Sequence, residues 1–178
     1  MRRSGVDIIG TRSSQGVSCI LLACINGHTD LLDYLLKHGA DPNDVEFYGG
    51  TCLMAAACHR NPDCVRRLIE VGADVDYRYS GDNATIVYMT AYCFSKDAEE
   101  EGEGEDLFEE GSVIRTVKLL LDAGSPGNTP SYTGEYEGDS RTALQLLIGM
   151  SVDTEGKVRR ERDGLIMLLQ DEDSDSDE

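Results

Sequence analysis

Two stretches of the sequence decide the fold. Ser18–Gly39 reads SCILLACINGHTDLLDYLLKHG, and Thr51–Gly72 reads TCLMAAACHRNPDCVRRLIEVG. Their first residues are 33 positions apart, and so are their final glycines. Each of these glycines opens a similar phrase, GADPN in the first copy and GADVD in the second. A period of this length is characteristic of proteins built from stacked repeats.

Two further copies follow, and both are interrupted. The third opens at Thr85 with TIVYMTAYCF and resumes at Val113, so Thr85 and Gly124 are 39 residues apart, where the first two copies have 21. The fourth opens at Thr142 with TALQLLIG and ends in the apolar run 165–169. We therefore expect a lead-in at residues 1–15 and a repeat domain at 16–169. Its units lie near 16–48, 49–82, 83–128 (with an acidic insert at 95–112) and 138–169.

Each copy carries the signals of two helices. A Ser or Thr precedes each short apolar run, and such residues cap helices because the hydroxyl accepts from an otherwise unpaired N–H. These caps are Ser18, Thr51, Thr85 and Thr142. Second helices are expected from Asp30, Pro62 and Val113, with Asn61 capping the second of them. Leucines at helical spacing, among them Leu35 and Leu68, predict a buried stripe. Glycines at 39, 72 and 124 are expected to end these helices.

The sequence resembles ankyrin repeats, whose motif T-P-L-H-x-A is followed by Gly-His and later by G-A-D-x-N. Gly27-His28 and the phrase Gly39–Asn43 match this pattern, and Gly72–Asp76 nearly does. The resemblance implies an all-α solenoid of helix-turn-helix units with short β-turn fingers. It covers roughly Gly16 to Leu169 and is strongest in the first two units.

The departures from the motif concern hydrogen bonding. No copy keeps the Pro or the His of the motif, so the network that ties neighbouring fingers in the family is expected to be absent or replaced. Arg60-Asn61 stands where the first copy has Gly-His, which predicts an altered turn. The fourth pair should carry the polar outer face of an end unit, through Lys157, Arg159, Arg160, Glu161 and Arg162.

Charge is concentrated in two segments. The formal net charge is −18, and Asp97–Glu110 (DAEEEGEGEDLFEE) holds nine acids while Asp171–Glu178 (DEDSDSDE) holds six. Such runs are typical of disordered interaction segments, so we expect residues 170–178 to be a disordered acidic tail. Ser174 and Ser176 in this tail resemble targets of acidophilic kinases, and are candidate phosphorylation sites. The alternative is an unmodified, solubilising tail.

Catalytic and metal-binding patterns are weak. The six cysteines show no CxxC spacing and are expected to be reduced, which favours an intracellular protein, cytoplasmic or nuclear, over a secreted one. A signal peptide ending in the apolar run 17–25 is a less favoured alternative, because that run is in phase with the repeat. Cys52, Cys58, His59 and Cys64 suggest zinc, but the repeat register points them in different directions. We expect no cofactor, no metal and no enzymatic activity.

Binding residues are expected on the fingers and the insert. The resemblance implies that partners contact the fingertips and the concave surface. The candidates are Phe47, Tyr48, Tyr77, Tyr79, Asp82, Tyr136 and Asp139 on the fingers, and Leu107 and Phe108 in the insert. The alternative for the aromatic residues is packing on a neighbouring finger, and for the insert an inert solvated loop.

The charge favours a protein partner with a basic surface. Direct binding to nucleic acid is disfavoured because phosphates would be repelled, and no run is long enough to cross a membrane. We expect a monomeric interaction module, in a narrower form a chaperone or adaptor. The alternatives are a competitor for a signalling partner that binds through its fingers, with the acids only aiding solubility, and a Cys/His metal-dependent enzyme.

Overall fold

Helices account for most of the structure. The computed structural model of the chain describes residues 8–79, 84–100, 109–127, 129–132, 140–150 and 156–175. Short turns join α1 (Cys19–Ile25) to α2 (Thr29–Lys37) and α3 (Cys52–Cys58) to α4 (Pro62–Glu70). The third pair is α5 (Ile86–Glu100) with α6 (Ser112–Asp122), and the fourth is α7 (Ala143–Gly149) with α8 (Lys157–Asp175).

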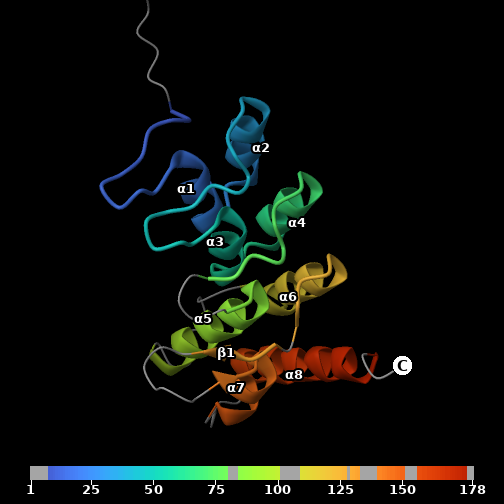
Figure 1. The fold of residues 1–178 in the computed structure, drawn as a ribbon. Coiled ribbons are helices and arrows are strands. Elements are labelled where there is room, and N and C mark those ends of the chain that lie inside the picture. Colours follow the sequence, from blue (N-terminus) through green and yellow to red (C-terminus); the bar gives the residue numbers. More distant parts are fainter. Residues whose placement is uncertain are drawn as a thin grey trace, which may run out of the picture.

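The four pairs stack in chain order (Figure 1). An inner row consists of α1, α3, α5 and α7, and an outer row of α2, α4, α6 and α8, with each helix packed on its neighbour in the row and on its partner in the pair. The all-helical stack expected from the 33-residue period is confirmed. In the described ranges the one ladder between named strands pairs β1 (Ser131–Tyr132) with β2 (Ser140–Arg141), antiparallel and two residues long, and the sequence did not predict it.

Helix starts follow the predicted chemistry. All four expected caps accept a hydrogen bond from the backbone N–H three residues on, at 3.4, 3.2, 2.9 and 3.2 Å for Ser18, Thr51, Thr85 and Thr142. Gln145 completes a capping box, because its side chain also accepts from the N–H of Thr142 at 3.0 Å. The glycines at 39, 72 and 124 have φ of 94°, 86° and 89°, as a left-handed helix end requires.

One continuous core runs through the stack. Leu35 and Leu68 are 1% and 0% exposed, which confirms the leucine stripe. Phe94 on α5 is fully buried, and Leu165 and Leu169 on α8 extend the core to the fourth pair. Stacking therefore buries apolar faces that a single pair would leave in water.

The turn between α3 and α4 differs from the prediction. Arg60 has φ 58°, close to the φ of 68° at Gly27, its counterpart 33 residues earlier. A residue with a Cβ seldom adopts this conformation. The expectation of an altered turn was therefore wrong, because the backbone conformation is kept. The two turns differ in their side chains.

Asn61 illustrates that change. Its side chain makes no capping bond to α4, so the predicted capping role was wrong. The amide instead donates to the carbonyls of Cys24 and Ile25, at 2.8 and 2.9 Å. Asn61 thus ties the second unit to the first because its side chain reaches back to the end of α1.

Two helices are longer than the sequence indicated. We expected the inner helix of the third unit to end near Phe94, yet α5 continues to Glu100 and contains the start of the acidic insert. We also expected helix to stop at Leu169, whereas α8 continues to Asp175, so the prediction of disorder from residue 170 was wrong as far as Asp175. The high charge density of this segment suggested a loop. Glu and Lys have good helix propensity, however, so the last turns of α5 remain helical.

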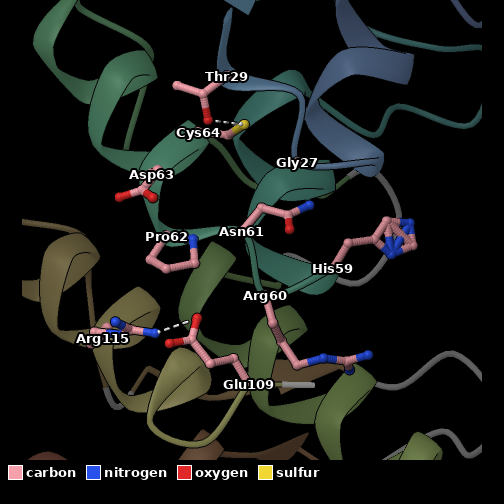
Figure 2. Close-up of a pocket in the computed structure, with 10 residues that line it drawn as sticks. All are labelled: Gly27, Thr29, His59, Arg60, Asn61, Pro62, Asp63, Cys64, Glu109 and Arg115. Atoms are coloured by element: carbon pink, nitrogen blue, oxygen red, sulfur yellow. Dashed lines mark hydrogen bonds and ion pairs between the residues drawn. The ribbon is translucent and has the colours of Figure 1, made fainter. Parts of the chain in front are cut away.

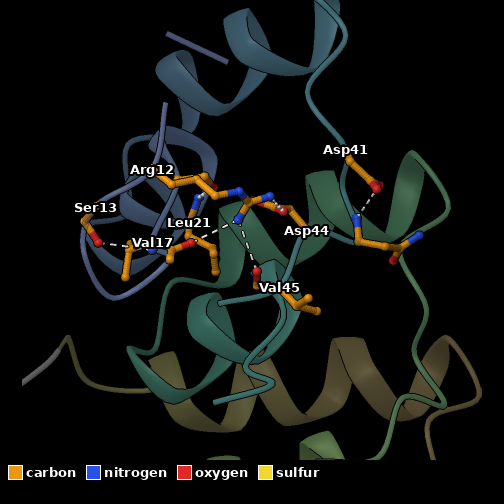
Figure 3. Close-up of polar contacts among 10 residues, drawn as sticks. Arg12, Ser13, Val17, Leu21, Asp41, Asp44 and Val45 are labelled. Carbon is orange, nitrogen blue, oxygen red and sulfur yellow. Dashed lines mark hydrogen bonds and ion pairs between the residues drawn. The ribbon is translucent and has the colours of Figure 1, made fainter. Parts of the chain in front are cut away.

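Fingers connect the pairs. Single antiparallel bridges close them at Arg12–Ser18, Val45–Thr51 and Tyr79–Ala84. The aspartates of the two GAD phrases, Asp41 and Asp74, accept from the N–H two residues on, at 2.9 and 3.0 Å (Figure 3 shows the first). These local turns explain why the phrase recurs with the helix period.

Candidate partner-binding surface

The most exposed aromatic residues lie on the second fingertip, which comprises residues 44–50. Phe47 and Tyr48 are 74% and 69% exposed, the highest values among the large hydrophobic side chains that the structure describes. Their turn is fixed by Glu46, whose carboxylate accepts from the N–H of Tyr48 at 2.7 Å and of Gly50 at 2.8 Å. Glu46 was not among the residues predicted from the sequence. Tyr48 and most of the Phe47 side chain are therefore exposed on a hydrogen-bonded turn.

The first finger supports the second (Figure 3). Arg12 donates to the carbonyls of Gly16 at 2.9 Å and Val45 at 3.1 Å, and it forms an ion pair with Asp44. The ring of Phe47 covers Gly16 so closely that a Cβ at that position would be 2.5 Å from the ring. Arg12, which was not among the residues predicted from the sequence, therefore ties the first finger to the second.

A cavity of about 340 Å³ lies at the opposite edge, beside the turns that join inner to outer helices (Figure 2). Arg60, Asp63, Glu109 and Arg115 give its lining both signs of charge, and Glu109 and Arg115 are paired at 2.9 Å. Burial, followed by the charge of Arg60, lowers the pKa of His59 on the same wall. Because the charges are balanced, the cavity favours neither a small anion nor a small cation.

The acidic insert leaves and rejoins the stack at this edge through ion pairs, here called its roots. At the first root Asp97 pairs with Arg60. At the second, Glu109 pairs with Arg115 at 2.9 Å, and Glu110 pairs with Arg160 of α8 at 2.6 Å. Arg160 lowers the pKa of Glu110 through this hydrogen bond.

Glu161 of α8 holds the second root through hydrogen bonds to the backbone. We expected it on the polar outer face, which was wrong, since Glu161 is 1% exposed. Its carboxylate accepts from the N–H of Gly111 and from that of Ile114 at 3.2 Å, and so caps the N-terminus of α6. Burial raises the pKa of Glu161 and Glu110 adds to this, while the two backbone hydrogen bonds and Lys157 oppose it.

Comparison with known proteins identifies the type of repeat. Residues 4–79 match a family model described as ankyrin repeats in three copies. Residues 4–79 therefore carry ankyrin repeats, and the later helix pairs continue the same stack. Ankyrin repeats are generally protein–protein interaction modules, and the family is generally not enzymatic.

Three curated relatives share part of the ankyrin region. Ankyrin repeat domain-containing protein SAT10 of Stachybotrys chartarum is 33% identical over 102 residues, 57% of this chain and 4% of that protein. The ankyrin repeat, SAM and basic leucine zipper domain-containing protein 1 of Carollia perspicillata is 31% identical over 108 residues, 61% of this chain and 20% of that protein. The inactive serine/threonine-protein kinase TEX14 of Mus musculus is 37% identical over 70 residues, 39% of this chain and 5% of that protein. The chain thus spans between 4% and 20% of these relatives.

The later ankyrin fingers use their aromatic residues differently. Tyr77 and Tyr79 are partly buried against the core, and the Tyr77 hydroxyl donates to the carbonyl of Gly49 at 3.0 Å. Tyr77 therefore packs on the preceding finger, which was the alternative interpretation of these residues. Phe47 and Tyr48 remain the exposed part of the candidate surface.

Most of the remaining predicted site residues lie outside the part of the chain that the structure describes. Asp82, Leu107, Phe108, Tyr136, Asp139 and Ser176 lie outside the described residues, and Ser174 lies in the last turn of α8. Within the described ranges no three His, Cys, Asp or Glu side chains gather as a metal site would require. Among the helices there, none has the length and apolarity to cross a bilayer.

Proposed function

We propose that this ankyrin-repeat chain binds a protein partner with a basic surface, through the second fingertip and the acidic insert. The observation that carries the proposal is the exposure of Phe47 and Tyr48 on a fixed turn. Aromatic side chains on a rigid backbone bury a large area at little entropic cost, and Tyr adds a polar tip. Asp82, Tyr136 and Asp139 on the following fingers are proposed to extend the contact.

The ion-paired roots refine the role of the insert. Among the described side chains of the insert, the acids at 97, 109 and 110 pair with arginines. Six further acids stand at positions 99–106 in the sequence. Neighbouring carboxylates create a field that attracts a cationic surface and speeds association. Leu107 and Phe108 supply an apolar contact next to those charges. A chaperone or adaptor that shields a basic protein is the narrower form of this proposal.

A second candidate rests on the separation of the two features. The fingertip precedes α3, whereas the insert roots lie at the edge where α3 and α5 end. Fingers alone could therefore compete for a signalling partner, with the acids contributing only solubility. The two functions differ in whether neutralising the insert changes binding.

The test uses variants that keep the roots. The insert variant is E101Q/E103Q/E105Q/D106N, and its matched control D171N/E172Q/D173N/D175N removes the same number of charges from the tail. The fingertip variant is F47A/Y48A, and its control is Y34A, a tyrosine 49% exposed on α2. Each chain is used for affinity capture from its own cells, and binding kinetics are then measured with the purified partner.

The expected results separate charge from contact. The insert variant should associate more slowly and lose salt dependence, because charges are screened over about 8 Å at physiological ionic strength. The fingertip variant should dissociate faster. If the insert variant associates at low salt as fast as the tail variant, the competitor function is favoured. If F47A/Y48A dissociates no faster than Y34A, the fingertip is not the binding site.

A further inference from the structure

Four of the six cysteines form two thiol pairs between inner helices. The thiols of Cys24 of α1 and Cys52 of α3 interact with each other, and both residues are 0% exposed. The thiols of Cys58 of α3 and Cys93 of α5 also interact with each other, but both residues are partly exposed. The second pair is thus the one that a small reagent can reach.

The partly exposed pair, Cys58 and Cys93, lies beside the first root of the insert. Cys93 and Asp97 are four residues apart on α5 and so share one helix face. Asp97 pairs with Arg60, two residues after Cys58, and the charge of Arg60 acts on both thiols. A nearby cation is a recognised feature of reactive cysteines, because it favours the thiolate.

The two thiols have different roles in this arrangement. The interaction with Cys58 lowers the pKa of Cys93, and Arg60 lowers it further against the opposing effects of burial and Asp97. The same interaction and burial raise the pKa of Cys58. Of the two thiols, Cys93 therefore ionises more readily.

We propose that Cys58 and Cys93 are a redox modification site that hydrogen peroxide converts into a disulfide between the second and third units. The Cys93 thiolate attacks one peroxide oxygen and the O–O bond breaks, which gives Cys93 sulfenic acid and hydroxide. The Cys58 sulfur then attacks the Cys93 sulfur, and the S–O bond breaks. The Cys58 proton and the departing hydroxyl leave as water. Overall, two thiols are oxidised to one disulfide and one peroxide is reduced to two waters.

This modification does not depend on the proposed partner. The bond would close the chain segment from residue 58 to residue 93 and join α3 to α5 at the point where the insert begins. Such a cross-link restricts the unfolded chain and stabilises the native stack. Peroxide would thereby lock the second and third units together.

The experiment counts thiols in the full chain. Reduced protein is freed of reductant, treated with a small excess of hydrogen peroxide, cleared of peroxide, unfolded in guanidinium chloride and alkylated with N-ethylmaleimide. Intact mass should fall from six adducts to four, and proteolysis should yield a peptide that links Cys58 to Cys93. The thermal midpoint should rise on oxidation and return after reduction.

Variants assign the order of attack. C58S should stop at a Cys93 sulfenic acid that dimedone traps, and C93S should remain unoxidised at the same dose. C24S, in the buried pair, is the matched control and should still form the Cys58–Cys93 bond. The proposal is overturned if wild-type protein keeps six adducts, if the linked peptide joins Cys24 to Cys52 instead, or if the disulfide joins two chains. The wild-type measurement decides the question even if a variant fails to fold.

Discussion

Replacing Asn61 with Ala measures how strongly the first two units are tied at the turn edge. The substitution removes two hydrogen bonds, to the carbonyls of Cys24 at 2.8 Å and Ile25 at 2.9 Å. A hydrogen bond contributes about 0.5–1.5 kcal/mol net, so the two together contribute about 1–3 kcal/mol. The Cys24 carbonyl keeps a contact from the N–H of Gly27 at 3.4 Å. We therefore expect N61A to lower the free energy of unfolding by about 1–2 kcal/mol, the lower part of that range.

Two further variants control for this interpretation. Asn26 makes a single side-chain bond, to the carbonyl of Leu22 in its own helix at 2.8 Å, and is exposed. N26A should therefore cost less than about 0.5 kcal/mol, as ordinary surface substitutions do. N61D keeps the shape but turns a carboxylate toward two carbonyl oxygens, so at neutral pH it should destabilise more than N61A. Its extra cost should shrink in acid, where a protonated carboxyl can donate one bond.

The assay is urea unfolding followed by circular dichroism at 222 nm. Because repeat units are coupled mainly to their neighbours, a weaker tie between the first two units should also reduce cooperativity and lower the m value. An N61A chain as stable as N26A, or an N61D chain as stable as the wild type at neutral pH, would contradict a stabilising role for Asn61. Either result would mean that the Asn61 bonds exchange with water without cost.

Three other predictions concern packing, titration and modification. Leu35→Ala and Leu68→Ala should each cost about 2–5 kcal/mol of unfolding free energy, and a urea titration showing under about 0.5 kcal/mol would place them at the surface. The pKa of Glu161 is raised in the folded chain, so its contribution is present below the unfolded pKa of about 4.3 and is lost as pH rises through the folded pKa. Wild type should therefore lose stability relative to E161Q from pH 4 to pH 7, and a pH-independent difference between the two chains would contradict this. Phosphorylation of Ser174 and Ser176, proposed from their acidic context, would place negatively charged phosphates at the C-terminal end of α8, where the helix dipole opposes them. Mass spectrometry of native protein should detect the phosphates, and circular dichroism should show a loss of helix.

The features of the fold that were predicted depend on residues that are close together in the sequence. A cap such as Thr51 is recognised from its position before an apolar run, and its hydrogen bond reaches only three residues along the chain. The leucine stripe and the glycine helix ends are equally local. The 33-residue offset then converts this local pattern into a stack, because each unit needs a neighbour to cover its apolar faces.

The side-chain contacts between units were not predicted. Arg60 reaches Asp97, 37 residues away, and Arg67 reaches Asp33, 34 residues away. Local periodicity does not indicate which exposed positions of two units meet. The period itself held a usable signal, since stacked units bring residues about 33 positions apart close together. The 35-residue spacing of Cys58 and Cys93 fits that rule and could have identified the pair.

The two roots of the insert also bear on how this region can evolve. One root is fixed to the second unit through Arg60 and the other to the fourth through Arg160, so the ends of the segment are anchored by neighbours on both sides. The entropy of closing a loop between fixed ends grows only with the logarithm of its length, and a doubling costs about 0.6 kcal/mol. Insertions and deletions between the roots therefore change the reach and charge of the segment at little expense in stability. The length of this segment can drift under selection for a partner while the stack of helices stays unchanged.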